Sequence, residues 1–212
     1  MTRYRTRLPV LFLLAAMVLS ARLAEGNQAE WEAPTELVRR ADLIVRGRFV
    51  AKRVLYFQAE AGRARCAFLY TMEVAEVVKG TAASSITIAS VDDVTFGKHG
   101  GALVLGFRLS RYQANRAANA HRFDFDKDAE ARNDCILNSG EFVTTMWPIS
   151  INPVVEFNPG DIWVEADSSS WLPDSIEGVA EKERGEGRSK KKLLRWEDLR
   201  RTILGWLASE TK

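Results

Sequence analysis

Alternating apolar and polar residues fill most of the first half of the chain after residue 42, and this period of two predicts β-strands. In the first strand Leu43, Val45 and Phe49 alternate with basic residues, which is typical of a strand with one buried face. Gly47 falls on that same face, where a glycine often marks a bulge or a sharp bend. The strands expected in this half cover residues 43–51, 65–78, 85–91 and 102–109.

Shorter strand patterns follow at 141–147, 153–157 and 161–165, with Asn158-Pro159-Gly160 as the turn between the last two. A short helix is expected to open at Pro34, with Thr35 as its N-cap. A second helix is expected over residues 195–208. Its apolar residues recur at helical spacing, at Trp196, Leu199, Ile203, Trp206 and Leu207.

Two stretches interrupt this pattern. Residues 110–134 are rich in Arg, Asn, Ala and Asp and carry few large apolar side chains, so we expect an excursion from the sheet that is partly helical. Residues 166–192 contain a serine run and a charge-dense segment, which is typical of a solvated loop.

Several short strands with a helix at each end predict a mainly β fold, an antiparallel barrel rather than a helical bundle. No internal repeat is visible. We expect residues 27–212 to form a single domain with loop insertions at about 110–134 and 166–192.

The N-terminus carries a different signal. Basic residues between Met1 and Arg7 precede an apolar run of twelve residues from Leu8 to Leu19, and small residues follow. The run is shorter than the roughly 20 residues of a membrane-spanning helix and matches a secretory signal peptide. We therefore predict a cleavable signal peptide over residues 1–26 and a periplasmic or secreted protein without a transmembrane anchor after cleavage. The alternative is a retained N-terminal anchor.

Removal of the signal changes the charge. The chain has 30 Lys and Arg residues against 28 Asp and Glu residues, and residues 1–26 contain four arginines and one glutamate. The remainder has 26 against 27, a net charge of about −1. This balance does not favour nucleic-acid binding.

Cys66 and Cys135 are the two cysteines of the chain. In an oxidising compartment an even pair is more often bonded than free, so we predict a Cys66–Cys135 disulfide. Two buried thiols that act as small apolar residues are the alternative.

Residues with catalytic or metal-binding chemistry are sparse. The two histidines, His99 and His121, have no neighbouring ligand pattern. Asp124, Asp126 and Asp128 alternate like the start of a calcium loop, but the glycine and the closing glutamate of such a loop are absent. Asp92-Asp93 is a carboxylate pair whose side chains would point to opposite faces of an extended strand. We therefore expect no catalytic set, no metal site and no cofactor, with a looser calcium site in the acidic loop 124–128 as the alternative.

Two further groups could contact a partner. The first is the tryptophans of the second half, Trp147, Trp163 and Trp171, for which packing beneath a loop is favoured over a binding patch. The second is a basic cluster that could contact an anionic membrane, although a solvated loop is favoured. It comprises Arg188, Lys190, Lys191, Lys192 and Arg195.

The segments from Ala41 to Val50 (ADLIVRGRFV) and from Tyr70 to Gly80 (YTMEVAEVVKG) resemble a pattern of secreted bacterial proteins. In that pattern a short helix leads into a first strand, and a second strand ends in a Lys-Gly pair. Such proteins are similar to the netrin-like, tissue-inhibitor-of-metalloproteinase (TIMP) type of oligonucleotide/oligosaccharide-binding (OB) fold. The resemblance covers residues 34–107 and the C-terminal helix, and it implies an OB-like barrel. Those inhibitors chelate the zinc of their target through an N-terminal cysteine, and no cysteine precedes Cys66, so the resemblance does not imply inhibition.

These observations predict an exported, non-enzymatic OB-like domain that binds a protein or an envelope component. The loops 110–134 and 166–192 are the expected binding positions. One alternative is a small metal-dependent hydrolase that uses Asp92, Asp93, His121 and the acidic loop. The other is a structural component of an envelope assembly, in which the C-terminal helix docks on a partner.

Overall fold

The computed structural model describes residues 33–91, 93, 101–120, 127–144, 154–156, 162–166, 171–173, 175–185 and 191–209. Several sequence predictions lie outside these residues: the signal peptide over 1–26, the turn at 158–160, and the residues Asp92, His99, His121, Asp124, Asp126 and Trp147.

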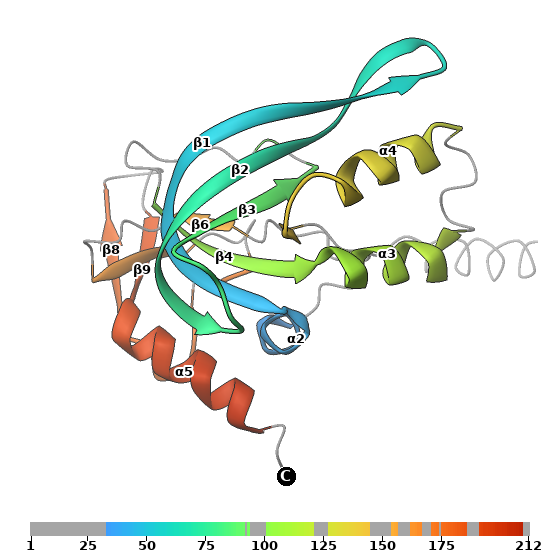
Figure 1. Cartoon of the computed structure of the whole chain (residues 1–212). Coiled ribbons are helices and arrows are strands. Elements are labelled where there is room, and N and C mark those ends of the chain that lie inside the picture. Colours follow the sequence, from blue (N-terminus) through green and yellow to red (C-terminus); the bar gives the residue numbers. More distant parts are fainter. Residues whose placement is uncertain are drawn as a thin grey trace, which may run out of the picture. The chain divides into compact units, whose positions relative to one another are not determined.

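The described chain is mainly β, with helices before, between and after the strands (Figure 1). The strands are β1 (Leu43–Ala59), β2 (Gly62–Lys79), β3 (Ser85–Ser90), β4 (Gly101–Arg108), β5 (Phe142–Val143), β6 (Val154–Glu156), β7 (Trp163–Ala166), β8 (Glu181–Arg184) and β9 (Lys191–Arg195). The helices are α2 (Pro34–Arg40), α3 (Leu109–Ala118), α4 (Ala129–Leu137) and α5 (Trp196–Ala208).

The main sheet closes on itself because β1 has strand partners on both of its edges. β1 pairs antiparallel with β2 along its whole length, and its first residues, Leu43 to Arg48, also pair antiparallel with β4. β3 joins β2 to β5, and β5 joins β4, with β3 and β5 parallel. Strands β1, β2, β3, β5 and β4 therefore form a closed ring of five, and β6 adds to β4.

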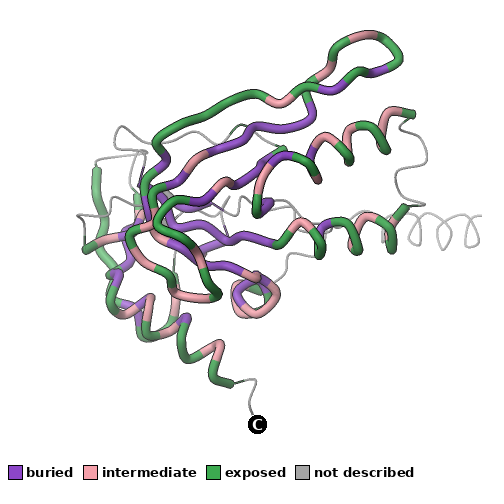
Figure 2. Tube along the Cα trace, in the orientation of Figure 1, coloured by how far each residue is buried: buried purple, intermediate pink, exposed green. Residues whose placement is uncertain are grey.

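The buried apolar residues of this sheet belong to two clusters, and Figure 2 shows buried segments in most of its strands. One apolar cluster draws all its fully buried residues from β1 to β6, among them Val45, Phe68, Met72, Ile88 and Val104. The strands themselves enclose this cluster within the described chain, so it forms the interior of the barrel. The other cluster combines the outer face of the strands with residues of every helix and of the second sheet. The predicted apolar stripe of α5 packs there: Trp196, Leu199 and Ile203 are buried.

The first strand is eight residues longer than the prediction, which ended it at Ala51. Register shifts interrupt its pairing with β2, one of them between Arg46 and Gly47, as the glycine indicated. β3 accompanies β2 only from Phe68 to Glu73, so β1 and β2 continue beyond it as a two-stranded ribbon (Figure 1). Residues 52–59 lie on this ribbon, beyond the end of the strand that the sequence predicted.

The two segments of the family resemblance meet at the start of β1. The Asp42 carboxylate accepts hydrogen bonds from the Arg111 guanidinium of α3, at 2.8 and 2.9 Å, and from the Arg108 backbone N–H. The Lys79 ammonium donates to the Val38 and Arg39 carbonyls at the end of α2, at 3.0 and 2.6 Å. These bonds tie α2, α3 and β2 to one point of the barrel.

Helix α2 begins at Pro34, as predicted, but the predicted N-cap is wrong. Thr35 is not the N-cap: Ala33 occupies that position without a side-chain capping bond, and Pro34 is the first helical residue. A proline suits this position because its missing N–H needs no partner there.

The two predicted insertions are more structured than expected. The described part of 110–134 is mostly helical, in α3 and the first part of α4. Within 166–192, β8 pairs with β9, which pairs with β7 in a second, three-stranded sheet. Trp171 and Leu172 are fully buried in this segment, so it is not a solvated loop throughout. The sequence pattern predicted a loop here because most charged residues of β8 and β9 occupy exposed positions.

Gly47 allows β1 to approach β2 closely, and its replacement tests the barrel closure. A Cβ at Gly47 would lie 2.2 Å from the Glu73 carbonyl oxygen, a backbone atom. We expect Gly47→Ala to lower the free energy of unfolding by about 1–3 kcal/mol, measured by urea denaturation. Gly205→Ala in α5 is the matched control because nothing lies within 4 Å of its added Cβ. It should raise stability by up to about 1 kcal/mol, and equal losses in both variants would contradict the argument.

Candidate binding surface

One face of the β1–β2 ribbon exposes cationic, aromatic and apolar side chains together. The register pairs Lys52 with Tyr70, Val54 with Phe68, Tyr56 with Arg65 and Gln58 with Arg63, and paired residues lie on the same face of a ribbon. We call the surface formed by Lys52, Val54, Tyr56, Arg63 and Arg65 the hairpin face; the Phe68 ring on the same side is buried beneath Lys52 and Arg65. Val54 and Tyr56 are 36% and 47% exposed, two residues apart on the same strand and on the same face.

The cations of the hairpin face lie over aromatic rings. The Arg63 guanidinium lies 4.1 Å from the Tyr56 ring centroid. The Arg65 guanidinium and the Lys52 ammonium each lie 4.6 Å from the Phe68 centroid. These cation–π contacts hold long side chains in place at an exposed surface, where they are worth about 0.5–1 kcal/mol each.

A small polar cluster borders the hairpin face where the ribbon joins the barrel. The Lys52 ammonium donates a hydrogen bond to Asp93, and the Tyr70 hydroxyl donates to the same carboxylate oxygen at 3.0 Å. The Lys52 hydrogen bond lowers the pKa of Asp93. Partial desolvation opposes it, and the Tyr70 hydroxyl and the charges of Lys52 and Arg65 reinforce it.

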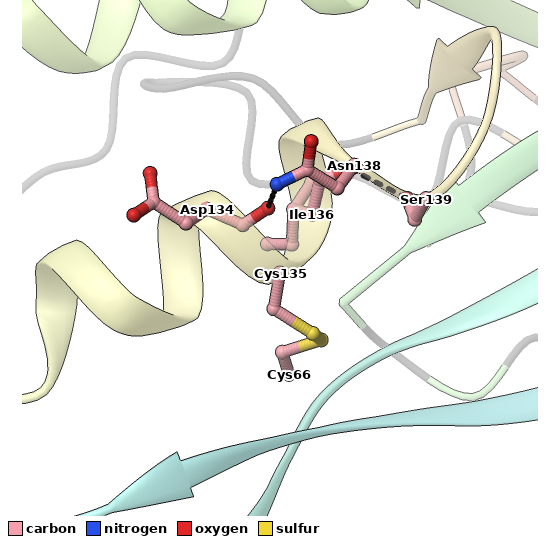
Figure 3. The surroundings of a disulfide bond; sticks show 6 residues. All are labelled: Cys66, Asp134, Cys135, Ile136, Asn138 and Ser139. Atoms are coloured by element: carbon pink, nitrogen blue, oxygen red, sulfur yellow. Dashed lines mark hydrogen bonds between the residues drawn. A yellow bond between two sulfur atoms is a disulfide. The ribbon is translucent and has the colours of Figure 1, made fainter.

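The opposite face of the ribbon is covered by α4. The structure confirms the predicted Cys66–Cys135 disulfide, which joins β2 to this helix (Figure 3). Further along the ribbon, the Arg132 guanidinium lies 5.7 Å from the Phe57 ring. At the hairpin turn the Glu60 N–H donates to Asp128 at 3.0 Å. Helix α4 therefore supports the ribbon from its middle to its tip.

Side chains close the end of α4 next to the disulfide (Figure 3). The Asn138 amide donates to the Asp134 carbonyl at 2.8 Å, and the Ser139 hydroxyl donates to the Ile136 carbonyl at 2.5 Å. The same two carbonyls also accept backbone hydrogen bonds from the Asn138 and Ser139 N–H groups, at 3.0 and 3.1 Å. Together these bonds fix the turn of the helix that carries Cys135.

The predicted catalytic and metal-binding candidates that the structure describes do not lie close together. Asp128 lies at the start of α4 and bonds the hairpin turn, and Asp93 belongs to the Lys52 cluster. In the described ranges, no three His, Cys, Asp or Glu side chains lie close enough together to hold a metal ion. Nor does any described helix combine the length and apolar character needed to cross a membrane.

The tryptophan and lysine candidates of the second sheet have partners within the chain. Trp171 is buried, as favoured, and the Lys182 ammonium lies 4.2 Å from the Trp163 ring. Lys191 forms an ion pair with Glu165, and Lys192 pairs with Glu181 at 3.4 Å. Arg188 and Lys190 lie outside the described residues. Two lysines of the basic cluster are therefore paired with carboxylates of neighbouring strands.

Sequence analysis missed the hairpin face because its residues looked like an ordinary charged segment after the first strand. The available signal was the alternation of Lys52, Val54 and Tyr56, with arginines two residues apart at 63 and 65. That spacing puts both arginines on one side of an extended strand.

No protein-family model matches the chain, and a search of curated proteins found no significant similarity. The structure thus defines a mainly β domain with a closed five-stranded sheet and an exposed hairpin face.

The disulfide should contribute strongly to stability. It closes a loop between residues 69 positions apart, for which the chain-entropy model gives about 4 kcal/mol. We expect the Cys66→Ala, Cys135→Ala variant to lose about 2–5 kcal/mol of unfolding free energy in urea. Reduction of the wild-type protein should give a loss of similar size, and unchanged stability in both experiments would contradict the prediction.

The Asp93 carboxyl should titrate below its ordinary value of 3.8. The pKa of Asp93 is lower in the folded chain than in the unfolded chain, so the ionised carboxylate stabilises the fold at pH values above the unfolded pKa. This contribution is lost as the pH falls through the folded pKa. NMR titration of the Asp93 carboxyl carbon measures the shift. In Lys52→Met the pKa should rise, whereas Lys127→Met, at the hairpin turn, should leave it unchanged. An unaltered pKa in Lys52→Met would contradict the assigned cause.

Proposed function

We propose that the chain is an exported, non-enzymatic binding domain with an OB-like barrel, and that its partner is a protein or another envelope component. The observation that carries the proposal is the hairpin face. It is an exposed surface of aromatic, apolar and cationic side chains on a ribbon whose other face is fixed by α4 and a disulfide. Surfaces of this composition are typical of protein interfaces, where Tyr and Arg are enriched.

The strand arrangement supports an OB-like assignment. An OB fold is a five-stranded Greek-key barrel. Here five strands close in the order β1, β2, β3, β5, β4, with a long β1 shared by two neighbours. Asp42 and Lys79, which belong to the segments that resemble the netrin and TIMP type, join the surrounding elements by hydrogen bonds. Metalloproteinase inhibition is not proposed, because no cysteine precedes Cys66.

Export is supported by the disulfide and by the signal-peptide pattern. Disulfides persist in oxidising compartments such as the periplasm and the extracellular space. The Cys66–Cys135 bond joins two elements of the fold rather than two ends of a mobile loop, as expected of a structural disulfide. The basic and apolar pattern of residues 1–26 gives the route of export.

A rigid ribbon suits recognition because binding then orders few side chains. Immobilising a flexible side chain at an interface costs about 0.5–1.5 kcal/mol. Arg63 and Arg65 are already held over rings. By contrast, the apolar face of α5 already packs against the rest of the chain, since Trp196, Leu199 and Ile203 are buried. The structure therefore favours the hairpin face over α5 as the binding position.

A crosslinked affinity capture from the native cell envelope tests this function. The tagged wild-type protein should retain one dominant partner, and Val54→Ser with Tyr56→Ser should reduce its recovery about tenfold or more, as expected for loss of two apolar contacts of about 1 kcal/mol each. Val77→Ser is the matched control: Val77 is 37% exposed but lies on β2 away from the hairpin face.

Two results would overturn the proposal. One is a blank capture together with stoichiometric metal in the purified protein, which would favour the metal-dependent hydrolase. The other is equal recovery by the wild type and the Val54, Tyr56 variant, which would move the binding position elsewhere.

A further inference from the structure

The cations of the hairpin face contact aromatic rings. Because a ring carries no net charge, these contacts do not neutralise the cations. Arg63 and Arg65 form no ion pair with any carboxylate of the described chain. Lys52 pairs with Asp93, whose side chain is half exposed. Other arginines of the described chain do have carboxylate partners, as Arg48 on β1 does with Glu73 and Arg200 on α5 does with Glu76. The hairpin face is therefore a locally cationic surface on a chain whose predicted mature charge is about −1.

Guanidinium groups stacked on rings keep their N–H donors directed to the side. A guanidinium that stacks with its flat face on a ring has its in-plane donors directed away from that ring. Such donors match a carboxylate, which can accept two parallel hydrogen bonds from one arginine. Two preorganised arginines of this kind favour an anionic partner with planar acceptors.

The spacing of these groups suits an extended chain. Arg63 and Arg65 are two residues apart, which along a strand is about 6.6 Å, the distance between alternate side chains of any extended segment. Val54 lies between Lys52 and Tyr56 on the neighbouring strand and supplies an apolar contact on the same face. Carboxylates at alternate positions of an extended segment would meet the arginines in turn.

We propose that the hairpin face binds an extended acidic segment of a partner protein. This inference rests on the proposed function and specifies the chemistry of its partner. An anionic membrane fits less well, because membrane-binding clusters contain about four to eight cations. The hairpin face has three, with Asp93 beside them.

The direct test uses a dye-labelled twelve-residue peptide in which glutamate alternates with threonine. Fluorescence anisotropy with the disulfide-bonded protein should give saturable binding that weakens with salt. The same peptide with glutamine in place of glutamate should bind at least tenfold more weakly. Failure of the glutamate peptide to bind below 1 mM (about −4 kcal/mol) would overturn the inference.

Charge reversal locates the site. Arg63→Glu with Arg65→Glu should weaken peptide binding about tenfold or more. The matched control, Arg53→Glu with Arg184→Glu, changes the net charge by the same amount. Arg53 pairs with Leu69 on the opposite face of the ribbon, and Arg184 lies on β8. The control should alter the affinity less than twofold, and an equal loss in both variants would show attraction by net charge alone and overturn the inference.

Two further measurements separate the alternatives. The first measurement uses vesicles that contain phosphatidylglycerol. If they bind the wild type more tightly than the peptide does, and do not bind the Arg63, Arg65 variant, the surface is assigned to a membrane instead.

In the envelope capture, recovery that depends on Val54 and Tyr56 but not on Arg63 and Arg65 would overturn the acidic-segment inference and leave the proposed function standing. Recovery insensitive to all four residues would overturn both. All four side chains are exposed, so the variants should stay folded and lose no more than the roughly 0.5–1 kcal/mol of each cation–π contact removed.

Discussion

The pairing of one strand with two partners organises this protein. The first part of β1 lies between β2 and β4, and this closes five strands into a ring whose interior is filled by strand residues alone. Closure needs a sharp change in the direction of β1, and Gly47 provides it where no Cβ would fit beside Glu73. Because β4 accompanies β1 only to Arg48, the remainder of β1 leaves the barrel together with β2. The exposed ribbon is thus a consequence of how the barrel closes.

A second set of contacts explains why short polar motifs stand at the ends of the strands. Lys79 closes the C-terminal carbonyls of α2, and Gly80, with φ of 82°, lets the chain pass the Asp42 carbonyl, 2.4 Å from where a Cβ would stand. Asp42 in turn binds Arg111 of α3. Residues 40 to 69 positions apart in the chain therefore meet at one junction, and hydrogen bonds hold them there.

The ribbon would be a weak structure alone, since an isolated two-stranded hairpin is marginally stable in water. Here the disulfide and α4 support one face, and cation–π contacts order the other. Most side chains of the supported face are apolar and at least partly buried, among them Leu55, Phe57 and Ala59, so the other face offers the larger surface to a partner. Stability and recognition are in this way assigned to opposite sides of the same two strands.

The sequence by itself determined the mainly β class, the four principal strands, both terminal helices and the bonded cysteines, because period-two and period-3.6 patterns and cysteine counts are local or compositional signals. It also marked Gly47 as a bend. It did not determine the length of β1, the second sheet or the burial of Trp171, since these depend on which distant element covers a face. The hairpin face belongs to this second group: Tyr56, Arg63 and Arg65 read as ordinary surface residues until strand register placed them on one side. Only the tertiary structure could decide this, because one bulge near Cys66 sets which side chains of β2 face α4 and which face outward.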